Sequence, residues 1–275
     1  IYHSLHGPGR RERLPDERLF SLIDELRDLG TKSLLFVGGG EPMTHPRTVD
    51  AIERAAGHGM SCGLVTNGSL VDAARGARLK QAATYVRFSF DAASRETHRA
   101  LHRHDDFDRI VSNLAALAAA DGPCTVGTGY FINEGNWREI VPNARMVKDA
   151  GAHYIQFKTY SGLALDPALH KRVLEQLDEA LDLAEPRFDV HIADRLFENQ
   201  AFQVRGYSRC HFQAMKTVIG ADGWLYLCAQ KRTNPAGRVG NVHEQTLGEI
   251  WDGVRRRAVV DGLDLVGCPY CVHDR

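Results

Sequence analysis

The sequence predicts an α/β protein in which parallel strands and helices alternate as a full or partial barrel, followed by a small cysteine-rich part. Strand-like and helix-like segments alternate through residues 15–192 at intervals of roughly 25 to 35 residues, as successive βα units do. A glycine-rich turn follows the first strand, and from about residue 200 the pattern changes to short strands and turns. Right-handed crossovers would place functional groups at the carboxyl ends of the strands.

Local signals define the expected elements in order. Pro15 stands where the first turn of a helix tolerates proline, and Gly30 ends the apolar periodicity of that helix. The apolar run over residues 31–37 has the length of a buried strand, and Asp222 with Gly223 forms a hairpin signal. Further helices are expected near residues 47–58, 70–81, 106–120, 137–149, 166–184 and 246–258, and further strands near residues 62–65, 85–90, 125–132, 153–158, 188–192 and 217–228.

The composition is that of a globular enzyme, with 275 residues, 43% hydrophobic residues, 25% charged residues and a formal net charge of −1. This charge gives no electrostatic basis for nucleic-acid or membrane partners. The sequence has no apolar run of membrane-spanning length and no signal peptide, so we expect a cytoplasmic protein. We expect one domain over residues 1–200 and another over residues 201–275. Because the first residue is Ile1 and not methionine, we also expect a segment upstream.

The turn after the first strand has the properties of a ligand site. Residues 36–42 read Phe-Val-Gly-Gly-Gly-Glu-Pro. Glycine lets a ligand approach the backbone N–H and C=O groups closely, and Pro42 cannot continue a central strand. A parallel sheet that binds a ligand at the carboxyl end of a strand needs such exposed backbone. The alternative is an ordinary strand-to-helix turn.

The cysteines fall into two groups. They are Cys62, Cys124, Cys210, Cys228, Cys268 and Cys271. The first two each begin a predicted strand, away from the expected ligand edge, and we interpret them as packing residues. The last four contain a Cys-x2-Cys pair and could close a tetrahedral metal or cluster site. Spacing does not choose between structural zinc and an iron–sulfur cluster, and four buried core thiols are the alternative.

Residues 39–42, Gly-Gly-Glu-Pro, resemble the motif of that composition in the radical S-adenosylmethionine enzymes. Residues 66–68 are similar to the end of the family's third strand, and residues 89–92 to the Ser-x-Asp of its fourth strand. The last four cysteines resemble the twitch domain, a short form of the SPASM extension that holds one auxiliary [4Fe–4S] cluster. The resemblance covers essentially the whole chain. It implies a partial (β/α)6 TIM-type barrel with a small C-terminal β-hairpin-plus-helix cluster-binding domain.

The family's Cys-x3-Cys-x2-Cys motif, which binds the catalytic [4Fe–4S] cluster, does not occur in these residues. In relatives it precedes the Gly-Gly-Glu-Pro turn, so we expect it upstream of Ile1, together with the first strand of a six-stranded partial barrel. The implied ligands of the auxiliary [4Fe–4S] cluster are Cys210, Cys228, Cys268 and Cys271. The implied S-adenosylmethionine contacts are Gly39, Gly40, Glu41, Pro42, Thr66, Asn67, Ser89 and Asp91.

The resemblance implies reductive cleavage of S-adenosylmethionine to a 5′-deoxyadenosyl radical, which abstracts hydrogen from a substrate. A reductase of the flavodoxin or ferredoxin type is the expected partner. We expect a small polar substrate, such as an aminocyclitol, an aminoglycoside or another sugar-like metabolite of antibiotic biosynthesis, which is dehydrogenated or epimerised.

The residues proposed to contact the substrate rest on position alone. They are Lys158, Tyr160, Tyr130 and Arg205. The alternatives are a charge on the rim for Lys158 and core packing with a solvated hydroxyl for the tyrosines. Two other functions stay open: a peptide-modifying member of the same family, and a zinc-stapled scaffold protein without catalysis.

Overall fold

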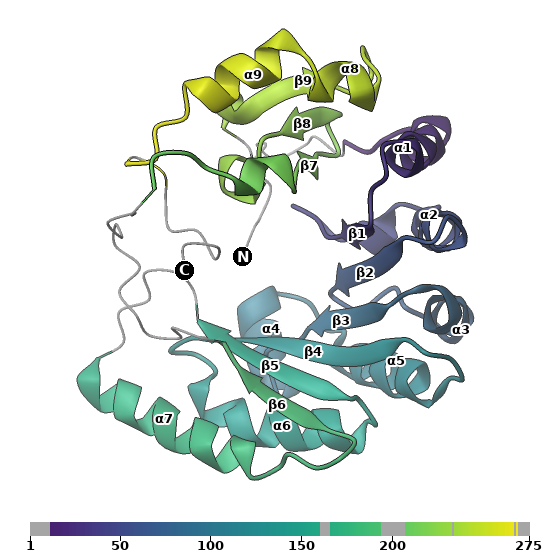
Figure 1. Ribbon diagram of the computed structural model, residues 1–275. Coiled ribbons are helices and arrows are strands. Elements are labelled where there is room, and N and C mark those ends of the chain that lie inside the picture. The colour runs from purple at the N-terminus through teal and green to yellow at the C-terminus, as the bar shows by residue number, and fades with distance from the viewer. Residues whose placement is uncertain (1–11, 160–165, 194–206, 233, 267, 269–275) are drawn as a thin grey trace. The chain divides into compact units, whose positions relative to one another are not determined.

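The computed structural model describes residues 12–159, 166–193, 207–232, 234–266 and 268 (Figure 1). Tyr160, Arg205 and Cys271 therefore lie outside the described residues. The chain divides into two compact units. One consists of residues 32–199, and the other combines residues 1–31 with residues 200–275.

The larger unit is a parallel α/β sheet, as predicted. Its six strands pair in chain order, and helices α2, α3, α5, α6 and α7 lie on one face of the sheet (Figure 1). The strands are β1 (Ser33–Phe36), β2 (Ser61–Thr66), β3 (Tyr85–Ser89), β4 (Thr125–Ile132), β5 (Tyr154–Thr159) and β6 (Asp189–Ile192). The helices are α2 (Thr48–Gly57), α3 (Ala73–Ala82), α4 (Arg95–His102), α5 (Phe107–Ala119), α6 (Ile140–Asp149) and α7 (Pro167–Leu181).

Two details of this unit differ from the sequence-based expectation. All six strands come from residues 33–192, so a six-stranded sheet forms here without a strand from before Ile1. Helix α4 was not predicted, because its eight residues are strongly polar. Ser94 caps this helix, its hydroxyl accepting a hydrogen bond from the Thr97 N–H group.

Successive side chains of each strand point to opposite faces of the sheet. One face is covered by the helices, and the other is called the inner face. The side chains directed toward the helices, such as Leu64, Phe88 and Phe157, are fully buried and form the core. On the inner face, opposite the helices, two glycines lie beside tyrosines on the next strand. A Cβ atom at Gly63 would stand 2.5 Å from the ring of Tyr85, and one at Gly127 would stand 2.3 Å from the ring of Tyr154. The tyrosines therefore lie across the neighbouring strands, because these strands have no side chain there.

Cys62 and Cys124 are packing residues, as predicted. Both lie near the amino ends of their strands and are essentially inaccessible to solvent. Burial raises the pKa of each thiol to about 11, which keeps both in the neutral form at physiological pH.

The smaller unit is built on a three-stranded antiparallel sheet. Its strands are β7 (Val218–Ile219), β8 (Trp224–Tyr226) and β9 (Arg238–Asn241), and its helices are α1 (Asp16–Asp28), α8 (Leu247–Trp251) and α9 (Val254–Asp261). Its core is apolar and consists of Leu22, Leu225, Leu227, Val239, Val242, Leu247 and Ile250. The predicted hairpin is present, and β9 is a third strand that the sequence did not indicate. The predicted single helix over residues 246–258 was wrong, because the extended backbone of Gly253 separates α8 from α9.

Helix α1 packs against the C-terminal part of this unit. The Arg18 Nε–H group donates to the Val242 carbonyl at 2.6 Å, and the Leu247 N–H group donates to the Glu25 carboxylate at 2.6 Å. Apolar contact of Leu22 with the C-terminal core accompanies these hydrogen bonds. The packing thus joins two segments more than 200 residues apart in sequence, a contact that local sequence signals do not show.

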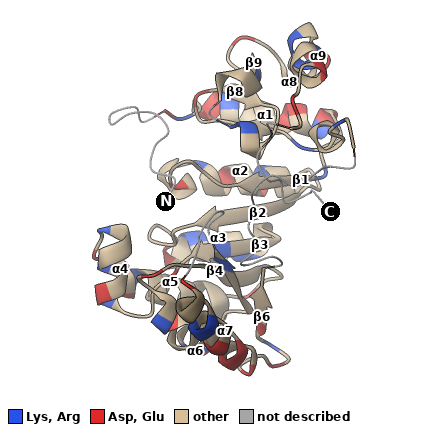
Figure 2. Cartoon of the chain, turned by 90° about the vertical axis from the view of Figure 1, so that its left-hand side faces the viewer, with Lys and Arg blue, Asp and Glu red and all other residues tan. Residues whose placement is uncertain are grey.

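Both signs of charge occur on the helices, as the blue and red segments of α4 and α7 show (Figure 2). Ion pairs such as Lys148 with Glu185, at 2.9 Å, join neighbouring elements. Within the described residues, none of the helices combines the length and the apolar character needed to cross a bilayer.

We expect Gly127→Ala to destabilise the protein by about 1–3 kcal/mol, because the new methyl group would overlap the ring of Tyr154. Urea denaturation would measure the loss. The matched control is Gly57→Ala in α2, where a Cβ atom meets nothing within 4 Å, and which should be neutral or slightly stabilising. Equal stability of the two variants would contradict this account of the inner face.

Candidate functional site

The predicted site residues follow three neighbouring strands at one edge of the sheet. The glycine-rich turn follows β1. Residues 66–68 begin at the last residue of β2, and residues 89–92 begin at the last residue of β3. The parallel register pairs Phe36 with Leu64 and Thr66 with Phe88. The three segments therefore end at the same edge, as the sequence predicted.

The carboxylate of Glu41 joins two of these segments. Its Oε1 atom accepts hydrogen bonds from the Met43 N–H group at 2.9 Å and the Thr66 hydroxyl at 2.6 Å. Its Oε2 atom accepts one from the Asn67 N–H group at 2.7 Å. The first bond caps the short 3-10 helix Pro42–Thr44, in which Pro42 occupies the first turn. Glu41 thus holds the turn after β1 against the end of β2.

The glycines of the turn have separate roles. A Cβ atom at Gly38 would lie 2.1 Å from the carbonyl oxygen of Gly40, so the path of the turn leaves no room for a side chain there. Gly39 and Gly40 are exposed, and a Cβ atom on either would meet no other atom within 4 Å. Their backbone N–H and C=O groups can therefore be approached by a ligand, as the sequence suggested.

The polar side chains after β2 are engaged within their own turn. The Thr66 hydroxyl accepts a hydrogen bond from the Gly68 N–H group at 3.1 Å in addition to donating to Glu41. The side-chain oxygen of Asn67 accepts from the N–H group and the hydroxyl of Ser69, at 2.9 and 2.8 Å. Contact with S-adenosylmethionine remains a prediction for both residues, while their geometry shows that they shape the turn.

After β3, Ser89 and Asp91 have different environments. Ser89 is exposed on the inner face, and its hydroxyl makes no hydrogen bond with any described residue. Asp91 is buried, and its carboxylate lies 2.6 Å from Nε2 of His102. This hydrogen bond raises the pKa of His102 and outweighs the effect of its burial. Ser89 is free to meet a ligand, whereas Asp91 positions a histidine.

Sequence reasoning missed His102 and its neighbour His98. The two rings are 4.8 Å apart, and Nε2 of His98 lies 2.8 Å from the Asp106 carboxylate. The available signal was the spacing of four residues between the histidines, which places both on one face of a helix. Each ring is held by its own carboxylate at the edge of the sheet where the ligand is expected.

The candidate substrate contacts separate in the structure. Tyr130 is fully buried, and its hydroxyl donates to the Asn136 carbonyl at 2.7 Å. Tyr130 is therefore part of the core, and its burial raises the pKa of its hydroxyl. Lys158 lies on the inner face of β5, where burial and the charge of Arg87 lower its pKa to about 8. Sequence reasoning missed Arg87, although glycines within β4 signalled the close approach of another group.

The described cysteines of the smaller unit have the chemistry that a cluster requires. Cys210, Cys228 and Cys268 form no disulfide and are of intermediate exposure, unlike the two buried cysteines of the sheet. Within the described residues, no group of three or more His, Cys, Asp or Glu side chains converges on a metal position. Thiolates are the ligands that iron–sulfur clusters use, so these residues fit a cluster by their chemistry, and the four-cysteine ligand set remains a proposal.

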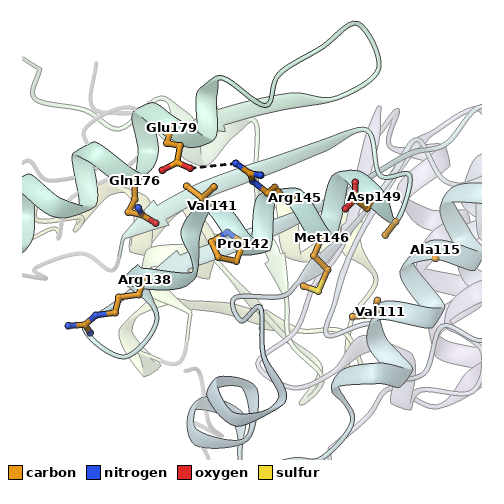
Figure 3. A pocket seen from close by; sticks show the side chains of 11 residues that line it. Val111, Ala115, Arg138, Val141, Pro142, Arg145, Met146, Asp149, Gln176 and Glu179 are labelled. Carbon is orange, nitrogen blue, oxygen red and sulfur yellow. Dashed lines mark ion pairs between the residues drawn. The ribbon is translucent and has the colours of Figure 1, made fainter.

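A groove of about 910 Å³ lies in the helical layer and not on the inner face of the sheet. Its lining includes Val111 from α5, Met146 from α6 and Glu179 from α7 (Figure 3). Arg145 and Glu179 form an ion pair across it at 3.5 Å. Because these residues come from the helices, we do not assign this groove to the site at the carboxyl edge.

Comparison with known protein families gives two matches. The model of the radical SAM superfamily matches residues 2–147, and that of SPASM, an iron–sulfur cluster-binding domain, matches residues 210–272. An AdoMet-dependent heme synthase of Methanosarcina barkeri is 26% identical over 275 residues, or 92% of this chain and 78% of the relative. The mycofactocin maturase MftC of Mycobacterium tuberculosis is 31% identical over 154 residues, or 54% of this chain and 39% of the relative.

Solved structures show the same fold. Streptococcus suis SuiB has a TM-score of 0.69 at 14% identity, with 89% of this chain and 61% of that chain covered. The anSMEcpe structure with bound AdoMet and the Kp18Cys peptide has a TM-score of 0.65 at 18% identity, with 95% of this chain and 78% of that chain covered. The chain thus spans less than two thirds of the lengths of MftC and SuiB.

We expect Glu41→Gln to destabilise the larger unit by about 2 kcal/mol, because one carboxylate oxygen that accepts a hydrogen bond becomes a donating amide. Thermal denaturation followed by circular dichroism would measure this effect. The control is Glu175→Gln on α7, where the exposed carboxylate makes one long ion pair of 3.9 Å. A wild-type melting temperature in Glu41→Gln would show that the carboxylate does not hold the turn.

The lowered pKa of Lys158 predicts a specific pH dependence of stability. Its folded-state value of about 8 lies below the ordinary value of 10.5. The unfolded chain therefore binds more protons between these values, and this group makes stability rise with pH across that window. We expect the stability advantage of Lys158→Met over wild type to be largest below pH 8 and to shrink toward pH 10.5. Urea denaturation at several pH values would measure it, and a constant difference would contradict the assignment.

Proposed function

Because the chain belongs to the radical SAM superfamily and carries a C-terminal iron–sulfur cluster-binding SPASM domain, we propose that it abstracts hydrogen from a polar substrate in an oxidative reaction. The observation that carries this proposal is the glycine-rich turn that Glu41 holds at the carboxyl edge of the parallel sheet. The two domains imply S-adenosylmethionine and iron–sulfur clusters, including an auxiliary cluster, as cofactors. When bound, these supply the electron and the 5′-deoxyadenosyl radical.

The residues of this chain would bind and orient the cofactor. The exposed backbone of Gly39 and Gly40 would bind the polar end of S-adenosylmethionine, and Glu41 would fix the position of that backbone. Ser89 offers a free hydroxyl at the same edge. Cys210, Cys228, Cys268 and Cys271 would hold the auxiliary cluster. The family's catalytic cluster would use a Cys-x3-Cys-x2-Cys motif, which does not occur in residues 1–275, and a flavodoxin- or ferredoxin-type reductase would supply electrons.

The proposed outcome is a two-electron oxidation. Four thiolates would leave the auxiliary cluster without an open iron site, so electron transfer is the role that suits it. Loss of a hydrogen atom, then of a proton and an electron, would turn the substrate into its dehydrogenated product. Cys210, Cys228, Cys268 and Cys271 would hold the cluster that supplies an electron acceptor for this oxidation. Epimerisation is the alternative, in which the substrate radical regains hydrogen on its opposite face.

The polar inner face supports a polar substrate. Arg87, Gln156 and Lys158 all lie on it, and a sugar-like metabolite remains the proposed class. The relative that matches 92% of this chain is by name a heme synthase, which favours a small molecule. A second candidate is a peptide-modifying enzyme. It is favoured by the likeness to MftC, a maturase by name, and by structures of this fold bound to peptides.

We expect the full-length protein, purified without oxygen, to contain about eight iron and eight sulfide per chain, as two four-iron clusters require. Replacing Cys268 and Cys271 by serine should remove about four of each. Cys62→Ser is the matched control and should keep all eight, because Cys62 is buried in the sheet. One zinc per chain without sulfide would overturn the proposal and favour the scaffold protein.

Product analysis would decide the outcome of the reaction. Oxidation predicts one 5′-deoxyadenosine per oxidised product and no solvent deuterium at the reacting carbon, whereas epimerisation predicts deuterium incorporation from D2O. Formation of 5′-deoxyadenosine only when a precursor peptide is added would favour the peptide-modifying candidate.

A further inference from the structure

Arg87 on β3 and Lys158 on β5 are two cations on the inner face of the sheet, and neither has a carboxylate partner among the described residues. The Nη1–H group of Arg87 on β3 donates to Oε1 of Gln156 on β5 at 2.9 Å. The side chain of Arg87 reaches β5 across Gly129, where a Cβ atom would stand 3.5 Å from its Cδ and Nε atoms. Lys158 lies two residues beyond Gln156 on the same face of β5. The missing side chain on β4 thus lets the guanidinium approach the strand that carries the lysine.

No described acidic residue forms an ion pair with Arg87 or Lys158. Asp189, which is on the same face, is paired in register with Tyr154 at the amino end of β5, four residues before Lys158. On the outer surface the situation is different, because Arg78 bonds to the carboxylates of both Asp50 and Glu53. Arg87 and Lys158 therefore lie close enough to repel each other, and no described acidic residue neutralises them.

This arrangement is unfavourable for the protein without a ligand. Lys158 is partly buried, and both its burial and its proximity to Arg87 disfavour its positive charge. Two like charges that are partly removed from water cost stability unless an anion joins them. Uncompensated charges of this kind are characteristic of binding sites. The matching ligand is an anion of carboxylate geometry, since guanidinium groups bind carboxylates through two parallel hydrogen bonds.

We propose that Arg87 and Lys158 bind a carboxylate group of the substrate, and that Gln156 orients the guanidinium for this contact. The proposal rests on the proposed function and narrows its small polar substrate to one that bears a carboxylate, such as an acidic sugar-like metabolite, in place of a cationic aminocyclitol. The cation pair spans β3 to β5, whereas the glycine-rich turn follows β1. Along the sheet, β3 is two strand spacings from β1, roughly 10 Å, and β5 is four spacings from it, roughly 19 Å. The substrate anion would thus lie on β3 to β5, beside Ser89 on the strand of Arg87, and the turn follows β1.

The test uses the full-length, cluster-loaded protein without oxygen, with sodium succinate as the probe. We expect succinate, compared with sodium chloride at equal ionic strength, to raise the melting temperature in a saturable manner. Arg87→Gln and Lys158→Gln should each weaken the apparent succinate affinity at least tenfold. Lys171→Gln, an exposed position on α7, is the control for the loss of one positive charge and should respond like wild type. No saturable response in wild type, or an unchanged response in both variants, would overturn the proposal.

The methionine part of S-adenosylmethionine also carries a carboxylate, so a second measurement separates the two sources. Equilibrium dialysis with labelled S-adenosylmethionine should give dissociation constants within twofold of wild type for Arg87→Gln and Lys158→Gln. A tenfold weakening would place the methionine carboxylate at the pair and overturn the assignment to the substrate. Cleavage of S-adenosylmethionine by wild type under dithionite tests the proposed function separately, so a protein that binds succinate but does not cleave would refute only that function.

Discussion

The carboxylate of Glu41 is the interaction on which the arrangement of the site depends. It accepts hydrogen bonds from its own turn and from the end of β2, so the segments after two neighbouring strands become one unit. A run of three glycines has high conformational freedom and would not keep one path unaided. Three charge-assisted hydrogen bonds offset that loss of freedom and leave the backbone of Gly39 and Gly40 exposed. The glycine backbone thus stays open to a ligand, and the hydrogen bonds of Glu41 hold the turn in one position.

The inner face of the sheet shows how small residues position large ones. Gly63 and Gly127 leave space that Tyr85 and Tyr154 fill, and Gly129 leaves space that Arg87 crosses. Glycine weakens a strand by its conformational entropy. The glycines of β4 therefore lower the stability of the sheet. In return they leave room for the guanidinium of Arg87 on β3 to reach Gln156 on β5. The opposite face, packed with residues such as Phe88 and Phe157, supplies the apolar burial that sustains this arrangement.

The smaller unit has a different basis for its stability. Its sheet has only short strands, and its core combines the C-terminal residues with Leu22 of helix α1. Arg18 and Glu25 of that helix bond to the backbone of the C-terminal segment. A small sheet of this kind needs further elements to cover it, and here a helix from the start of the chain contributes to its core. A cluster bound by the cysteines of this unit would add to that stability.

The sequence by itself determined the order of the βα units, the edge at which the glycine-rich turn lies and the group of cysteines near the C-terminus. These features depend on side-chain periodicity and turn conformation within a few residues, which a single sequence displays. Only the tertiary structure decided which groups meet across strands. Glu41 finds Thr66 at a separation of 25 residues and Arg87 finds Gln156 at 69, while Arg18 finds Val242 at 224. Such contacts depend on strand register and on the space left by neighbouring glycines, and neither is encoded in a local pattern.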